Sequence, residues 1–253
     1  MAEIGIEELA EMLAGAWERA QAVTAPSRLR PQTDLADAYR IQEMVVGHRL
    51  AAGRRIAGWK MGLTSSPESE PIVGILLDDM VVASGTTLDP ATMVAPLVEA
   101  ELVFVAGETI PAGATVEDIA AGDHRVAAGL EVIDYRTVDS QGVVDWVADN
   151  STVTFAVVGE LRPLAEVTPL TEIGVELRRD GEVLATGDGS LVMGEPLRAI
   201  AWLADHLAGR GLLLEPGAVV LTGSLTGHHR AVPGAGYSAR FDRLGEVSAS
   251  FAT

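Results

Sequence analysis

The spacing of apolar positions changes near residue 54. Before that point apolar residues recur every three or four positions, which predicts amphipathic helices over 6–17 and 35–50. The same spacing returns over 196–208, where Pro at the start and Gly just after the end are typical helix boundaries. A shorter helical piece is predicted after Thr115. Helices are therefore expected mainly near the two ends of the sequence.

From residue 54 onward, short apolar runs alternate with Gly, Pro and Asp, which predicts strands and turns. The clearest strands are expected over 55–61, 98–105, 127–133, 152–158, 174–179, 183–186, 219–222, 237–241 and 247–251. This order predicts an α+β fold, with an N-terminal helical region over 1–53 and a β-rich body over 54–253. We expect the two parts to form one compact unit.

Composition and charge narrow the possible functions. The hydrophobic share of 48% is enough for a substantial core, and the formal net charge of -18 argues against nucleic acid or anionic membranes as partners. The absence of cysteine excludes disulfides, thiolate metal sites and a cysteine nucleophile, and it fits a cytoplasmic protein. The first residues lack the basic start and apolar core of a signal peptide, and no apolar run reaches the roughly 20 residues that span a bilayer.

Three glutamates interrupt apolar strands. Glu99 and Glu101 lie two positions apart in one run, so they should point to the same face, and Glu131 lies in a second run. A buried carboxylate is costly unless a cation or dense hydrogen bonding compensates it. Three converging carboxylates would suit a hard divalent ion such as Mg²⁺ or Mn²⁺. A solvent-exposed strand end with inert glutamates is the alternative that spacing alone leaves open.

A lysine in a predicted strand is the next candidate. Lys60 has Gly58 and Gly62 as neighbours on its own face, which leaves room for a ligand beside it. If buried, this lysine would need a counter-charge from glutamates or a bound carboxylate. The alternative is an ordinary lysine at a strand end whose ammonium group reaches the solvent.

Other polar residues lie in turns and glycine-rich loops. Asp79 follows an apolar run and could orient a water molecule or Lys60, although aspartate is common in turns without such a role. Asp149, Asn150 and Ser151 are typical of a turn, and their functional interpretation is hydrogen bonding to a polar ligand. The amides of the loop over 223–227 could hold a carboxylate. None of these loops matches a phosphate-binding or dinucleotide-binding pattern.

Together these motifs resemble the hydratase and decarboxylase branch of the fumarylacetoacetate hydrolase superfamily. Known members of this branch are 2-keto-4-pentenoate hydratase, 2-oxohept-4-ene-1,7-dioate hydratase and 4-oxalocrotonate decarboxylase. The resemblance covers about residues 35–251. It is carried, in chain order, by GWKMGLTS (58–65), GILLDDM (74–80), VEAE (98–101), LEVID (130–134), ADN (148–150), LTGS (221–224) and GEVS (245–248). Each string is weak by itself, but the whole series in one order is specific.

The resemblance implies the family's mixed β-roll body with an N-terminal helical region. It implies that Glu99, Glu101 and Glu131 bind Mg²⁺ or Mn²⁺, that Lys60 is the active-site lysine, and that Asp79 orients water or relays a proton. Substrate contacts are expected at Leu63, Asp149, Asn150, Ser224 and Thr226. Family substrates are small 2-oxo acids from the breakdown of aromatic compounds, which chelate the ion through the C1 carboxylate and the C2 oxygen. A homo-oligomer is expected, with a pathway enzyme as a possible further partner.

Two lyase reactions fit this resemblance. Hydration of a 2-hydroxy-2,4-dienoate and decarboxylation of 4-oxalocrotonate share an enolate that the ion stabilises as a Lewis acid, with Lys60 stabilising charge and moving a proton. The strings over 74–80 and 223–224 are closest to the heptenedioate hydratase, which favours hydration. C–C bond hydrolysis and oxaloacetate decarboxylation occur elsewhere in the superfamily. A non-catalytic partner subunit is an alternative of another class, and metal binding without turnover would indicate it.

The chain also departs from the family pattern. Leu97 stands where a basic residue is usual, and Glu195 stands where histidine is common. The segment over 65–74, a region that tends to cover the site, is shorter than usual. The unusual stretch over 228–230 has two adjacent histidines, a poor metal pair that could still bring basic groups to the pocket. We therefore expect an altered 2-oxo acid as the substrate.

Overall fold

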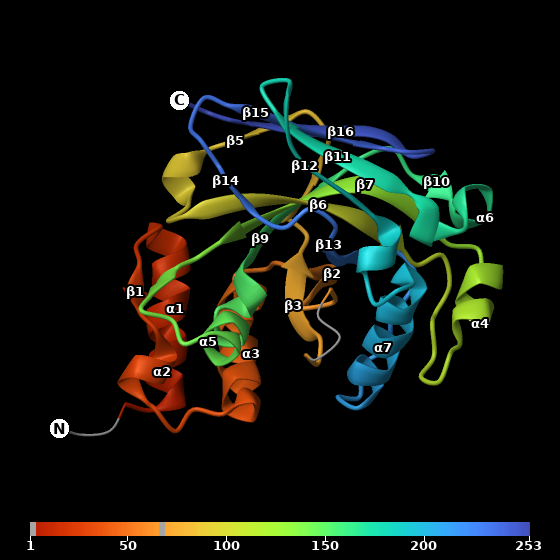
Figure 1. Ribbon diagram of the computed structural model, residues 1–253. Coiled ribbons are helices and arrows are strands. Elements are labelled where there is room, and N and C mark those ends of the chain that lie inside the picture. The colour runs from red at the N-terminus through yellow and green to blue at the C-terminus, as the bar shows by residue number, and fades with distance from the viewer. Residues whose placement is uncertain (1–3, 66–68) are drawn as a thin grey trace.

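Two curled β-sheets form the body of the protein in the computed structural model, which describes residues 4–65 and 69–253 (Figure 1). The larger sheet has the order β3-β2-β13-β6-β7-β9-β4, with β10 beside β7 and β14 beside β6. The smaller sheet has the order β12-β11-β15-β16-β5 and lies above the larger one in Figure 1. A short parallel pair, β1 and β8, is separate from both.

The strands of the larger sheet are β2 (Ile56–Gly62), β3 (Ile72–Leu77), β4 (Val81–Ala83), β6 (Pro96–Val105), β7 (Arg125–Asp134), β9 (Val153–Val158), β10 (Arg162–Pro163), β13 (Val219–Ser224) and β14 (His229–Arg230). Those of the smaller sheet are β5 (Thr86–Leu88), β11 (Gly174–Arg179), β12 (Glu182–Asp188), β15 (Gly236–Phe241) and β16 (Gly245–Phe251). The remaining pair is β1 (Val23–Thr24) and β8 (Thr137–Val138).

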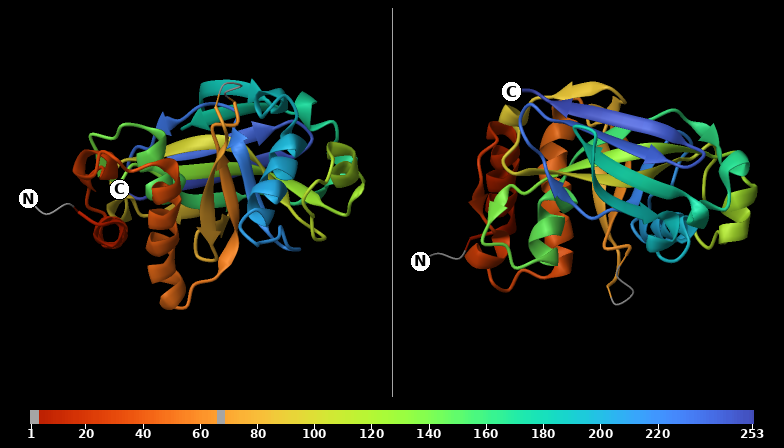
Figure 2. Two further views of the ribbon diagram at one scale, coloured as in Figure 1. Left: turned by 90° about the horizontal axis from the view of Figure 1, so that it is seen from below. Right: turned by 45° about the horizontal axis from the view of Figure 1, so that its top comes forward.

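The helices are α1 (Ile6–Arg19), α2 (Pro26–Leu29), α3 (Leu35–Ala51), α4 (Val116–Ala121), α5 (Val143–Ala148), α6 (Leu164–Val167) and α7 (Pro196–Ala208). Short 3₁₀ turns are η1 (Pro90–Thr92), η2 (Asn150–Thr152), η3 (Leu170–Glu172) and η4 (Gly189–Leu191). Figure 2 shows α1, α2 and α3 at one end of the molecule, beside the sheets. None of the helices in the described residues is long and apolar enough to cross a membrane.

Apolar side chains fill both faces of β6, the strand that carries two of the candidate glutamates. One face, with Leu102 and Phe104, belongs to the core between the two sheets. The other face, with Val103, packs with Leu76 of β3 and Val46 of α3. Burial on both faces explains why this strand is apolar at nearly every position and why its glutamates are exceptional.

The N-terminal helices bury their apolar stripes against a later segment of the chain. Leu9 and Leu13 of α1, Ile41 and Val45 of α3, and Val147 of α5 share one core cluster. The side chain of Asp34 accepts a hydrogen bond from the Asp37 backbone at 2.8 Å and caps α3. The first helical region therefore packs against α5, which is far away in sequence.

The predicted α+β class and the four helical segments named from the sequence are confirmed. The predicted strands are also present, with ends that agree or shift by one or two residues. Strand β3 and helix α5 were not predicted, and Thr152, expected to begin a strand, belongs instead to η2. The division of the chain at residue 53 stays a prediction.

Candidate active site

Three glutamates meet on the larger sheet, as their sequence positions predicted. Strands β6 and β7 are antiparallel, and their register places Glu99 directly opposite Glu131. Carboxylate oxygens of Glu99, Glu101 and Glu131 lie within 4.8 Å of one another. All three residues are buried, and Glu131 has no exposed surface. The two strands are hydrogen-bonded along their whole length, so the glutamates are held by rigid backbone.

Lys60 of β2 joins this cluster. Its Nζ lies 3.2 Å from Oε1 of Glu131. Burial by itself lowers the pKa of Lys60, but the charges of Glu131, Glu99 and Glu101 outweigh that effect and raise the pKa above its ordinary value. Lys60 is therefore an ammonium group, and one positive charge faces three carboxyl groups.

The carboxyl groups are short of positive charge. Burial, and then the charges of Glu131 and Glu99, raise the pKa of Glu101 well above its ordinary value, although Lys60 and the Gly223 amide act against this. Burial raises the pKa of Glu131 to about 7, against the favourable charge of Lys60. Oε2 of Glu131 has no hydrogen-bond partner among the described residues. Oxygen ligands grouped in this way are the donor set of a hard divalent cation.

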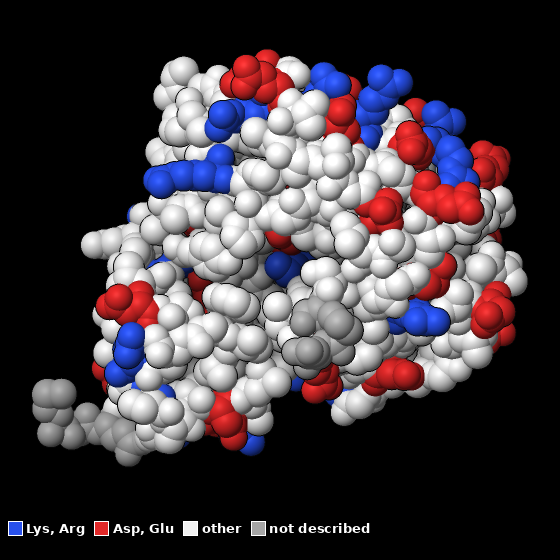
Figure 3. All heavy atoms as spheres, viewed as in Figure 1, with Lys and Arg blue, Asp and Glu red and all other residues white. Residues whose placement is uncertain are grey.

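A cavity of about 530 Å³ opens beside this cluster. Lys60, Glu99 and Glu101 are part of its wall. The other lining residues are Met61, Gly62, Leu63, Thr64, Ser65, Ile72, Ile133, Tyr135, Trp146, Ser151, Thr152, Thr186, Leu191, Ser224, Leu225, Thr226, Gly227 and His228. Figure 3 shows a hollow near the middle of the face viewed in Figure 1, with basic and acidic atoms at its bottom. The volume is sufficient for a small organic acid.

Two hydroxyl groups in the wall lack protein partners. The side-chain oxygens of Thr64 and Ser224 are buried and have no hydrogen-bond partner among the described residues. Gly223 precedes Ser224 and lies against Thr64: its amide donates to Glu101 at 2.8 Å, and a Cβ there would lie 1.8 Å from Oγ1 of Thr64. Its φ of +117° also suits glycine. These orphaned hydroxyls are available to water or to a ligand.

A left-handed turn forms another part of the wall. Asn150, Ser151 and Thr152 have φ values of 51°, 48° and 62°, although none is glycine. Each such residue costs on the order of 1–2 kcal/mol. Hydrogen bonds hold the turn to β3: the Asn150 amide pairs with the Ile75 backbone at 2.8 and 2.9 Å, and Ser151 Oγ donates to the Val73 carbonyl at 2.8 Å. Strained backbone that is over-determined in this way is typical of ligand-binding walls.

The structure brings some predicted substrate contacts to the cavity and not others. Leu63, Ser224 and Thr226 line it. Asp149 and Asn150 do not line it: Asp149 is buried in an ion pair with Arg136, and Asn150 faces the β3 backbone. Both belong to the segment that carries the left-handed turn.

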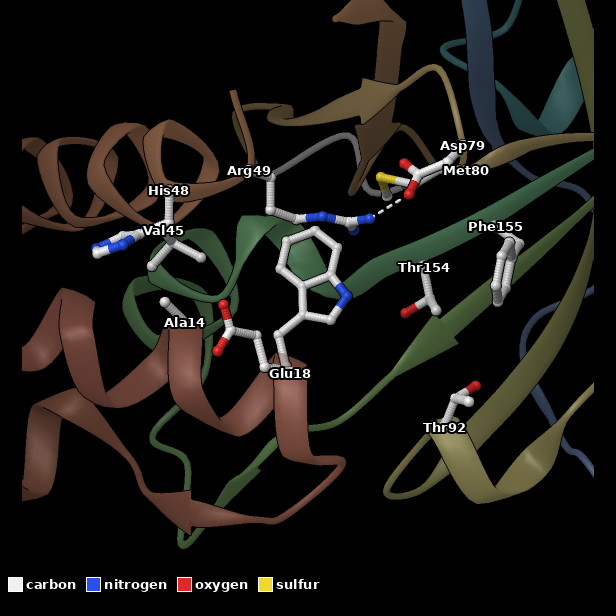
Figure 4. A pocket seen from close by; sticks show the side chains of 11 residues that line it. Ala14, Glu18, Val45, His48, Arg49, Asp79, Met80, Thr92, Thr154 and Phe155 are labelled. Carbon is white, nitrogen blue, oxygen red and sulfur yellow. Dashed lines mark hydrogen bonds and ion pairs between the residues drawn. The ribbon is translucent and has the colours of Figure 1, made fainter. Parts of the chain in front are cut away.

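Asp79 lies apart from Lys60, in a second pocket of about 340 Å³. It forms ion pairs with Arg49 and with Nε of Arg54, the latter at 3.1 Å. Figure 4 shows Arg49 reaching across this pocket to Asp79, opposite Thr154. The geometry does not bring Asp79 to the glutamates, so its position does not support the expected catalytic role.

The residues that depart from the family pattern also have defined positions. His228 lines the cavity with its Nδ1 4.0 Å from Oε1 of Glu99, so this unusual stretch does bring a basic group to the pocket. Leu97 pairs with Arg230 across the β6–β14 ladder and is not part of the cavity wall. Part of the short segment over 65–74, residues 66–68, lies outside the described residues.

Sequence reasoning missed Tyr135, Trp146, Thr152 and Thr186 as lining residues. Of the predicted turn over 149–151, Ser151 does line the cavity, and Thr152 follows it directly. Tyr135 follows the second glutamate strand directly. Trp146 and Thr186 had no sequence signal, because they reach the cavity through tertiary packing.

Comparison with known proteins agrees with this geometry. The family model described as "Fumarylacetoacetate (FAA) hydrolase C-terminal" matches residues 46–251. A 2-keto-4-pentenoate hydratase from Paraburkholderia phymatum is 35% identical over 255 residues, covering 97% of each chain. A 4-oxalocrotonate decarboxylase from Pseudomonas putida is 33% identical over 251 residues, covering 96% of this chain and 95% of the relative.

A solved structure shows the same fold. The 4-oxalocrotonate decarboxylase from Pseudomonas putida G7, complexed with magnesium and adipate, superimposes with a TM-score of 0.91 at 33% identity and covers 97% of each chain. The mixed β-roll with N-terminal helices, expected from the motifs, is thereby confirmed. The chain belongs to the fumarylacetoacetate hydrolase family.

Proposed function

We propose that this protein is a Mg²⁺- or Mn²⁺-dependent lyase that hydrates a small 2-hydroxy-2,4-dienoate. The observation that carries the proposal is the buried cluster of three glutamates and Lys60 in the wall of a cavity of suitable size. Family membership and the activities of its relatives support the same reaction class.

The residues present fit a divalent cation. Three ionised glutamates and one protonated lysine leave two negative charges, which a divalent ion would balance. Glu99, Glu101 and Glu131 would hold the ion, and the unpartnered oxygen of Glu131 is the clearest sign of a missing positive partner. When bound, the ion would supply Lewis acidity at the C2 oxygen of a 2-oxo acid.

The protein's own groups have distinct tasks. Lys60 brings positive charge close to the place where the substrate becomes electron-rich, and its raised pKa keeps it charged. The free hydroxyls of Thr64 and Ser224 are suited to hold the water that is added or the oxygen atoms of the substrate. Leu63, Ile133 and Trp146 provide an apolar wall for the carbon chain.

The charge of the cavity favours a substrate with one carboxylate. Among the described residues that line it, Lys60 and His228 are basic, and Lys60 already faces the glutamates. No arginine of the described residues lines the cavity to pair with a second carboxylate. A dienoate with a single carboxylate therefore fits better than the dicarboxylate 4-oxalocrotonate.

A turnover assay with Mg²⁺ tests the proposal. We expect 2-hydroxypenta-2,4-dienoate to lose its conjugated absorbance without release of CO₂. Release of CO₂ from 4-oxalocrotonate, with the dienoate untouched, would establish the decarboxylase instead. Decarboxylation is the second candidate because the fold closely matches that of a 4-oxalocrotonate decarboxylase. Metal binding with neither substrate consumed would indicate either the altered 2-oxo acid substrate expected from the departures in sequence or a non-catalytic subunit.

The expected partners and location follow from the same proposal. We expect a homo-oligomer that works in the cytoplasm, in a pathway that degrades aromatic compounds. We also expect that it can associate with another enzyme of that pathway. Size-exclusion chromatography with light scattering would measure the number of copies.

A further inference from the structure

A buried arginine outside the cavity is bound to the left-handed turn in its wall. Arg136 is 1% exposed and directly follows the lining residue Tyr135. Its Nε donates to Oδ1 of Asp149 at 2.8 Å, and its Nη2 donates to the Asp149 backbone carbonyl at 3.0 Å. The same carbonyl accepts from the amide of Thr152 at 2.9 Å. Arg136 thus fixes the residue from which the turn starts.

The turn that Arg136 fixes lies beside Lys60. In the β2–β3 register, Lys60 is directly opposite Gly74, so their Cβ directions lie on the same face. A Cβ at Gly74 would lie 2.8 Å from the Asn150 carbonyl oxygen and 3.2 Å from Cβ of Ser151. The turn therefore occupies the space that Gly74 leaves next to the active-site lysine.

The N-terminal helix α1 supports the arginine from the other side. The guanidinium carbon of Arg136 lies 4.5 Å from the ring centroid of Trp17, and its Nη1 donates to Thr154 at 3.2 Å. Trp17 belongs to α1, which precedes the residues matched by the family model. Through the contact between Trp17 and Arg136, the N-terminal region therefore packs against the residues that support the cavity wall.

We infer that Arg136 is a positioning residue: through Asp149 it sets the Ser151–Thr152 wall of the cavity, and Trp17 of α1 holds it in place. Arg136 does not line the cavity and has no contact with the glutamate cluster. A guanidinium group can bind the carboxylate and the carbonyl of Asp149 together, whereas a lysine ammonium lacks this planar fork. Without the Arg136 guanidinium, the strained turn loses two hydrogen bonds to Asp149, and the cavity wall beside Lys60 is expected to shift.

The kinetic test of this inference rests on the proposed function, because it uses the proposed substrate. Hydrogen exchange and metal binding test it without any turnover. In the full-length protein, Arg136→Ala should make the backbone amides over 149–153 exchange faster with deuterium, while β6 and β7 keep their protection. Mn²⁺ affinity, measured by calorimetry, should stay within about twofold because the glutamates are rooted in other strands.

Steady-state kinetics distinguish a displaced cavity wall from a loss of metal binding. For Arg136→Ala with Mg²⁺ and the dienoate, KM should rise about tenfold or more, with a smaller fall in kcat, because misplaced substrate contacts are costly. Added guanidinium should restore part of the loss, and Arg136→Lys should behave like Arg136→Ala. Thr115→Ala, which removes the capping box of α4, is the matched control and should leave KM and exchange over 149–153 unchanged.

A second variant guards against a folding defect. If Arg136→Ala does not fold, Trp17→Leu should show the same changes in smaller size, because it leaves the Asp149 pair intact. Unchanged exchange over 149–153 and unchanged KM in a folded variant would overturn the inference. So would a loss of Mn²⁺ affinity as large as the rise in KM. Inactive wild-type protein would instead contradict the proposed function, and the exchange experiment would still decide the role of Arg136.

Discussion

Two clusters of acidic and basic side chains in this molecule have opposite charge balance. Beside the larger cavity, Glu99, Glu101 and Glu131 share Lys60. Beside the second pocket, Asp79 is paired with both Arg49 and Arg54. Acids that outnumber their partners need a cation from outside the chain, whereas an acid with two arginines is already compensated. Counting partners therefore distinguishes a candidate metal site from a structural ion pair better than acidity alone.

The largest effect is expected from removing a charge of the acid-rich cluster. Glu131→Gln should lower Mn²⁺ affinity by more than about a hundredfold and abolish most turnover, since even indirect partners of metal ligands can cost ten- to a hundredfold. Calorimetric titration and the Mg²⁺-dependent assay measure both. Asp79→Asn is the matched control, and equal losses in the two variants would remove the distinction between the clusters.

Lys60→Ala should separate metal binding from chemistry. The three glutamates stay in place, so metal binding should persist, while kcat should fall by about 10²–10⁴-fold, as for other groups that stabilise charge or transfer protons. Steady-state kinetics at saturating Mg²⁺ is the measurement. Full activity in this variant would show that Lys60 only balances the charge of the glutamates.

Asp79→Asn should act on stability instead of activity. Arg49, which is partly buried, and Arg54, which is exposed, would lose their shared partner. We expect a cost of about 1–3 kcal/mol in the free energy of unfolding, mostly from the Arg49 pair. Urea unfolding measures this cost, and the kinetic constants should stay within about twofold of wild type because the site is separate. A large kinetic loss with unchanged metal affinity would restore the catalytic role that the sequence suggested for Asp79.

The smallest effect has the opposite sign. Without metal, Glu101→Gln should raise the free energy of unfolding by about 1 kcal/mol, because glutamine keeps an acceptor for the Gly223 amide and removes a repelled buried charge. The pKa of Glu101 is raised in the folded state, so ionisation weakens the metal-free fold as pH increases, and the gain should be larger at pH 8 than at pH 5. Destabilisation at pH 8 would contradict this charge argument.

The glutamate cluster was partly predictable from local signals. Strand periodicity gives the shared face of Glu99 and Glu101, and an apolar environment marks all three glutamates as exceptional. Local spacing could not show that Glu131 meets the other two, and that expectation came from the family resemblance. Strand β3 was missed because it is apolar on both faces and interrupted by Gly74, so its pattern does not distinguish strand from helix.

The wall of the cavity was less predictable. Left-handed backbone is usually signalled by glycine, but Asn150, Ser151 and Thr152 adopt it here. Asn150 and Ser151 are held by hydrogen bonds to β3 that no local pattern records. Asp149 was interpreted as a ligand contact, but its partner is Arg136 in a separate strand–loop segment. Tertiary contacts that override local preference cannot be read from one sequence.

The position of Trp146 in the cavity wall gives the protein a natural fluorescent reporter. Of the four tryptophans, all within the described residues, Trp146 alone lines the catalytic cavity. Trp202 lies elsewhere, stacked on His206 with ring centroids 4.9 Å apart. Binding of paramagnetic Mn²⁺ should quench the fluorescence of Trp146, whereas binding of Mg²⁺ should leave it nearly unchanged. Occupancy of the site could then be followed optically, in real time and without any substrate.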